Sequence, residues 1–108
     1  MPDCKVEVDP GVCKMHTVIV AKMGEDMMSV VFEVESDCPH VKKMAQSLEP
    51  VEPYSNVGGP IDKNPIYTCA GANLPHSACP VPCAFVKGME VASDLGLMRD
   101  VNIKITKL

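Results

Sequence analysis

Residues 16–35 have the sequence HTVIVAKMGEDMMSVVFEVE, and this stretch decides the fold. Two runs rich in β-branched residues, 16–23 and 28–35, flank a turn that contains Gly24 and Asp26. Such an arrangement predicts a β-hairpin. The second run alternates between an apolar face and a mostly charged face, with Val30, Phe32 and Val34 set against Val31, Glu33 and Glu35. Alternation with period two predicts a sheet with one buried face and one solvent-exposed face.

Helices are expected on the C-terminal side of this hairpin. Pro39, after Asp37 and Cys38, suits the first turn of a helix that ends before Pro50. Its core stripe has the spacing i, i+3, i+4 and i+7 and consists of Val41, Met44, Ala45 and Leu48. A long Pro- and Gly-containing loop, residues 49–64, follows this helix.

Two further helices and two further strands complete the expected elements. Asn64 and Pro65 start a short helix, and residues 82–95 form the strongest helix of the chain. Residues 5–8 predict a short edge strand, and the alternation over 101–106 predicts a last strand. We therefore expect an α+β two-layer sandwich, in which the hairpin and the C-terminal strand share one sheet and two to three helices cover one face.

Length, charge and cysteine usage restrict the classes of function. The chain has 108 residues, so we expect a single domain over 1–108. The net charge is −4 and Lys and Arg do not cluster, which argues against nucleic-acid binding. No apolar run is long enough to span a membrane, and the N-terminus lacks a secretion signal, so we expect a cytoplasmic protein. Six cysteines in that compartment indicate metal or redox chemistry rather than disulfides.

Four cysteines lie where the expected elements begin or end. Cys13 precedes the first hairpin strand and Cys38 follows the second, so antiparallel pairing predicts that they are neighbours at one edge of the sheet. Cys79 and Cys83 flank the start of the last helix, which reaches the same edge if that helix packs back on the sheet. The predicted site therefore contains Cys13, Cys38, Cys79 and Cys83.

Thiolates gathered in this way are typical ligands of zinc or an iron–sulfur cluster. The spacing from Cys79 to Cys83 is Cys-x₃-Cys, and no Cys-x-x-Cys occurs. Each of the three histidines follows or precedes a candidate cysteine by two or three residues, so His16, His40 or His76 is an alternative fourth ligand. The leading hypothesis is a small metal- or cluster-binding protein with a structural or carrier role.

Two other classes of function stay open. In a thiol enzyme or redox protein, Cys38 or Cys83 at a helix N-terminus would be the nucleophile, with a neighbouring histidine as base. In an interaction module, the long loop would bind a protein partner and the cysteines would be buried. Cys4 and Cys69 are expected to pack as small apolar side chains in all three cases. The sequence predicts no particular reaction.

Three segments carry a resemblance to a known family: DPGVC at 9–13, SDCP at 36–39 and ACPVP at 78–82. On these segments the chain resembles a family of small uncharacterised cysteine-containing proteins of methanogenic archaea and other anaerobes. The resemblance implies an anaerobic cytosol and the trio Cys13, Cys38 and Cys79 as the shared site. Cys83 lies outside the recognised pattern, and the resemblance implies no activity.

Overall fold

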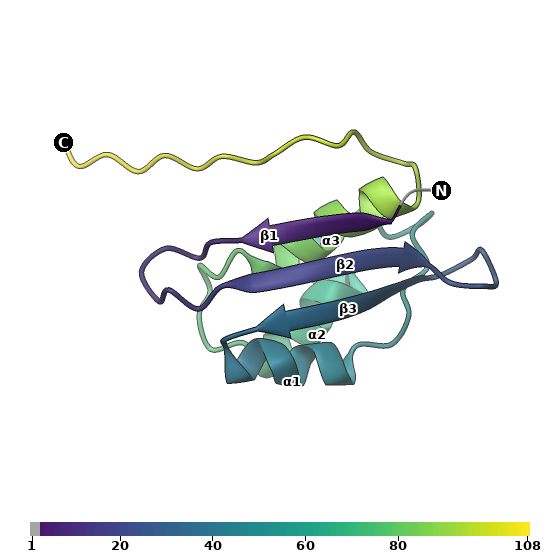
Figure 1. Cartoon of the computed structure of the whole chain (residues 1–108), viewed down its shortest axis with the longest axis horizontal. Helices are drawn as coiled ribbons and strands as arrows, with labels where there is room; N and C mark the ends of the chain where they lie inside the picture. The colour runs from purple at the N-terminus through teal and green to yellow at the C-terminus, as the bar shows by residue number, and fades with distance from the viewer. Residues whose placement is uncertain (1–2) are drawn as a thin grey trace.

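A computed structural model describes residues 3–108 and shows an α+β fold, with helices covering one face of an antiparallel sheet (Figure 1). The predicted fold class is therefore confirmed. The elements in chain order are β1 (Cys4–Val8), β2 (Thr17–Met23), β3 (Val30–Ser36), α1 (Pro39–Ser47), the 3₁₀ turn η1 (Ile61–Lys63), α2 (Pro65–Asn73) and α3 (Val81–Ala92).

The predicted hairpin forms the centre and one side of the sheet. Strands β2 and β3 pair antiparallel from Thr17 opposite Ser36 to Met23 opposite Val30. The facing in β3 is as predicted, because Val30 is buried toward the helices and Glu33 is exposed on the open face. In β2, Ile19 and Ala21 are fully buried, so this strand turns its odd-numbered residues to the core, opposite the even-numbered residues of β3.

The third strand of the sheet is β1, and the predicted C-terminal strand is wrong. The strand order is β1-β2-β3, with β1 antiparallel to β2 from Cys4 opposite Ala21 to Val8 opposite Thr17. Residues 101–106 form no strand and run past the sheet as an exposed tail (Figure 1). Their alternation supplies strand propensity, but a strand also needs a paired neighbour for its backbone groups, and the tail has none within residues 3–108.

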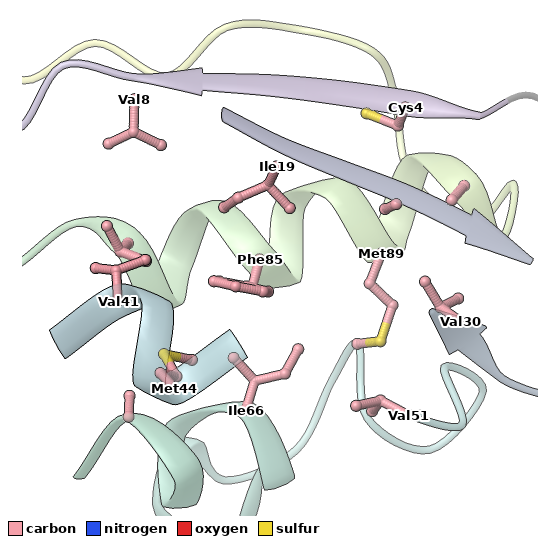
Figure 2. Packing of buried hydrophobic residues seen from close by; sticks show 14 residues of the cluster. Cys4, Val8, Ile19, Val30, Val41, Met44, Val51, Ile66, Phe85 and Met89 are labelled. Atoms are coloured by element: carbon pink, nitrogen blue, oxygen red, sulfur yellow. The ribbon is translucent and has the colours of Figure 1, made fainter. Parts of the chain in front are cut away.

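Helix α3 lies across β1 and β2 and approaches the sheet closely at Gly88. A Cβ at this position would lie 3.2 Å from Val6 Cγ2 and 3.3 Å from Ala21 Cβ, which is tighter than ordinary van der Waals contact. One turn earlier, the fully buried Phe85 ring meets Phe32 edge to face at a centroid distance of 5.0 Å. Phe85 lies in the middle of the packed side chains (Figure 2).

The other two helices complete this core. Val41 and Met44 of α1 are buried, in agreement with the predicted stripe, and Ile66 and Ala70 of α2 are buried as well. Helix α1 packs on β3, and α2 packs on α1 and α3. No helix in the described part of the chain is long and apolar enough to cross a membrane.

Helix α3 ends three residues earlier than expected, at Ala92 rather than at 95. Asp94 adopts a positive φ of 62°, the amide of Leu95 donates to the carbonyl oxygen of Glu90 at 2.8 Å, and the amide of Asp94 donates to the carbonyl oxygen of Val91 at 3.0 Å. This is the hydrogen-bond pattern of a Schellman-type helix end. The cap turns the chain away from the core, which leaves Leu95, the last residue of the expected helix, 46% exposed.

Replacing Gly88 by Val is expected to destabilise the protein by about 1–3 kcal/mol, because the added side chain overpacks the contact between α3 and the sheet. Gly71 of α2 is the matched control, since a Cβ there meets nothing within 4 Å. Urea unfolding of Gly88→Val and Gly71→Val measures the difference. Equal free energies of unfolding for the two variants would show that the close approach does not limit side-chain size.

Candidate functional site

The structure separates the six cysteines by burial, and all of them are free thiols. Cys4 is buried in the core, and burial raises its pKa. Cys69 is half-buried against the same core, where its thiol donates to the carbonyl oxygen of Met44 at 3.5 Å and accepts from Asn73 Nδ2 at 3.7 Å. Burial is also the main cause of the raised pKa of Cys69. Both residues pack as small apolar side chains, as predicted.

Cys13 and Cys38 lie on neighbouring segments at one end of the sheet. The amide of Asp37 donates to the carbonyl oxygen of His16 at 3.0 Å, which joins the β1–β2 loop to the junction between β3 and α1. Cys13 is exposed within that loop. Cys38 is half-buried at the N-cap of α1, and its amide donates to Ser36 Oγ at 3.0 Å. The antiparallel pairing therefore brings the two segments together in the way the sequence predicted.

Cys79 lies on a third segment at this end. The connection from α2 to α3, residues 74–80, runs past the same end of the sheet as the β1–β2 loop (Figure 1). Its Cys79 is half-buried against the core, and the Cys79 amide donates to the carbonyl oxygen of His76 at 3.2 Å. Three cysteine-bearing segments that are far apart in the sequence thus share one end of the sheet.

The side chains on these segments are not assembled into a ligand set. Among residues 3–108, no group of three or more His, Cys, Asp or Glu side chains is placed to hold a metal ion. His16, His40 and His76 are all exposed. Their role as an alternative fourth ligand therefore stays a prediction. The fold brings the segments together, while the thiols remain apart.

Cys83 has a different environment from the trio. It is exposed in the first turn of α3 and lines a surface pocket of about 140 Å³. The pocket lies between the outer face of α3, helix α2 and the loop 56–61, and its lining includes Tyr67, Lys87 and Glu90. Burial raises the pKa of Tyr67, and the negative charge of a Cys83 thiolate raises it further.

The pocket wall is held by contacts that the sequence did not predict. Val51 in the long loop exchanges two backbone hydrogen bonds with Val30 at the start of β3, at 2.8 and 3.0 Å. Asn64 caps α2 and donates from Nδ2 to the carbonyl oxygen of Asn56 at 2.6 Å, which ties the loop to the helix. Another residue of the pocket, Lys87, could have been predicted from helical spacing alone. It follows Cys83 by four residues and therefore lies next to Cys83 on the same face of the helix.

Fold and site together define a small α+β protein with three cysteine-bearing segments at one end of its sheet and a fourth cysteine in a lateral pocket. The chain belongs to the family described as "Family of unknown function (DUF6951)", whose match covers residues 4–105. This assignment confirms that the sequence resembled a family without an assigned function. Searches of curated proteins and of solved structures found no match.

Stability is expected to fall as the pH rises above about 9, where thiols and the phenol begin to ionise. The pKa values of Cys4, Cys69 and Tyr67 are raised in the folded state, mainly by burial. Their contribution to stability is complete below the pKa values of the unfolded chain, and it is lost as the pH rises through the folded values. Guanidinium unfolding with a thiol reductant, compared between about pH 8 and about pH 11, measures this loss.

In Tyr67→Phe the upper part of the pH dependence is expected to flatten, because this variant lacks the phenol whose pKa burial raises in the folded state. A free energy of unfolding that stays constant or increases over the same pH range would contradict the prediction.

Proposed function

We propose that the protein binds a soft metal ion or an iron–sulfur cluster through Cys13, Cys38 and Cys79. The observation that carries this proposal is the position of three chain-distant, cysteine-bearing segments at one end of the sheet. Thiolates are the preferred ligands of zinc and of iron–sulfur clusters. The role is that of a carrier or a structural site, with Cys83 or a histidine as the fourth ligand.

Local structure does not explain the cysteines at positions 13 and 38. The N-cap of a helix favours Ser, Thr, Asp or Asn, because their side chains accept backbone hydrogen bonds. Cys38 packs against the edge of the core, but it occupies the N-cap of α1 without a side-chain cap hydrogen bond, so helix capping gives no reason for a cysteine there. Cys13 is exposed, so core packing gives no reason for it either. A role in ligand binding accounts for both.

Assembly of the site requires a movement of the β1–β2 loop. Cys13 lies in a small local turn, in which the amide of Lys14 donates to the carbonyl oxygen of Gly11 at 3.0 Å and the amide of Gly11 donates to Asp9 Oδ1 at 3.1 Å. The residues around Cys13 are exposed and do not contribute to the core. Binding of a metal would therefore draw this loop toward Cys38 and Cys79 without disturbing the sheet.

Purification without oxygen, followed by reconstitution with zinc or with iron and sulfide, tests the metal proposal. The wild-type protein is expected to hold about one metal ion or cluster per chain. Replacing Cys13, Cys38 and Cys79 together by Ser is expected to abolish binding, whereas the control Cys69→Ser retains it, because Cys69 lies outside the site. A wild-type content of less than about a tenth of an equivalent of zinc, iron and sulfide would refute the proposal.

A second candidate function, thiol chemistry at Cys83, is favoured by the pocket. Cys83 is accessible there, with Lys87 one helical turn away and the Tyr67 hydroxyl as a proton donor within the same wall. None of the three histidines lines this pocket, so this hypothesis has no histidine base; the raised pKa keeps the Tyr67 hydroxyl protonated, which suits a proton donor and not a base. The charge interaction between Cys83 and Tyr67 shows that the two groups are close enough to influence one another.

Alkylation by iodoacetamide at neutral pH, followed by mass spectrometry of each cysteine, tests this candidate. Cys83 is expected to react fastest of the six, because it is exposed in a pocket that also contains the positively charged Lys87. Lys87→Gln is expected to slow Cys83 several-fold without changing the rate at Cys13, which is the exposed internal reference. If Cys83 of the metal-free protein reacts no faster than Cys13, thiol chemistry at this pocket is excluded.

A further inference from the structure

The C-terminal segment 101–105 has the pattern of a strand but no partner. Val101, Ile103 and Ile105 alternate with polar residues and are 57%, 76% and 91% exposed. Beyond residue 99, no backbone group of the tail makes a hydrogen bond within the described residues 3–108. The family match nevertheless extends through residue 105 and so covers this segment. An exposed apolar strand pattern calls for a binding partner.

The outer edge of β1 is also unpaired, and it has the same alternation. Strand β1 is the first in the order β1-β2-β3, so one of its edges carries backbone groups without a neighbouring strand. Cys4, Val6 and Val8 turn toward α3, and Lys5 and Glu7 are exposed on the open face, where they form a 3.2 Å ion pair. Both β1 and the tail segment are five residues long.

Helix α3 provides an apolar surface beneath this edge. Gly88 lies against Val6 and Ala21, and helical periodicity places Ala84 and Val91 on the same side of α3. Ala84 and Val91 are only half-buried, so this stripe is incompletely covered. A strand added beside β1 would place its inward side chains over the stripe.

We infer that residues 101–105 of one chain add to the free edge of β1 in a second copy, as a fourth strand parallel to β1. With 101–105 alongside 4–8, Val101, Ile103 and Ile105 extend the apolar face. On the other face Lys104 lies beside Glu7 and Asn102 lies beside Lys5. The two segments have the same length, the same alternation of apolar and polar residues, and complementary charges. These matches favour this register, because a shift by one residue would turn the apolar side chains of the added strand to the opposite face.

The partner is a second copy because each chain carries both the unpaired segment and the unpaired edge of β1 that matches it. In the single chain the tail leaves the end of the sheet where β1 starts and runs in the direction of β1 without pairing with it (Figure 1). The cap at Glu90 sets this exit direction. Reciprocal exchange in a closed two-fold dimer pairs each tail with the β1 edge of the other copy and leaves neither tail and neither β1 edge unpaired.

Light scattering and sedimentation of the full chain, in the presence of a thiol reductant, test the exchange. A dimer is expected. In Ile103→Glu/Ile105→Glu the dissociation constant is expected to rise at least about tenfold, because carboxylates replace the inward side chains. The control Asn102→Glu/Thr106→Glu adds the same charge on the outward face and is expected to change the constant by less than about threefold. Neither variant touches the core of the single chain, and circular dichroism checks its fold.

Mixing two charge variants shows whether the segment is exchanged between chains. Glu7→Lys and Lys104→Glu each place like charges together in their own dimer, whereas the mixed dimer has opposite charges at both contacts. The mixed species is therefore expected to exceed its statistical share. Two results would overturn the inference. One is a protein that stays monomeric, whether or not the amides of 101–105 are protected from hydrogen exchange. The other is a dimer whose dissociation constant does not change in Ile103→Glu/Ile105→Glu.

Discussion

The close contact between α3 and the sheet at Gly88 is the constraint on which the arrangement of the molecule depends. A residue without a side chain lets the helix backbone approach Val6 and Ala21, so α3 covers β1 and β2 together. The helix then directs Phe85 onto Phe32 in the middle of the core. Because this contact fixes the distance of α3 from the sheet and the direction of the helix, the first turn of α3 reaches the end of the sheet that carries the other cysteine-bearing segments.

Most of the elements follow from local patterns in the sequence. The hairpin was predictable because β-branched runs flank a turn, and α1 and α2 were predictable because Pro39 and Pro65 begin them and apolar stripes continue them. Pairing between elements was harder to predict. The pattern at 101–106 indicates strand propensity, but propensity does not specify whether an edge is available, and the third strand is Cys4–Val8, where the sequence predicted an edge strand at residues 5–8.

For the candidate site, the sequence likewise predicted which segments lie together but not how their side chains are placed. Antiparallel topology alone placed Cys13 near Cys38, because the start of one hairpin strand must lie beside the end of the other. The pocket around Cys83 depends on Tyr67 from a different helix and on a loop held by Val51, and neither contact leaves a periodic pattern. Side-chain assembly at the end of the sheet was also beyond reach, because it depends on distances that topology does not specify.

Burial divides the cysteines into two populations with different chemistry. Cys4 and Cys69 belong to the core and contribute packing, whereas Cys13 and Cys83 are accessible to solvent. Cys38 and Cys79 lie between these populations, at the boundary between the core and the end of the sheet. A single fold thus supports two separate thiol environments, one built from three loops and helix starts and the other from a helix face and a proline- and glycine-containing loop.

The order of the elements along the chain has a consequence for biosynthesis. The sheet is complete at Ser36, but the helix that covers β1 and β2 begins only at Val81. During translation the apolar face of the sheet, including Ile19, is therefore made well before α3 emerges to cover it. The nascent chain must pass through a stage in which this face is open to solvent, and such stages are those at which unpaired strands associate or are protected by chaperones.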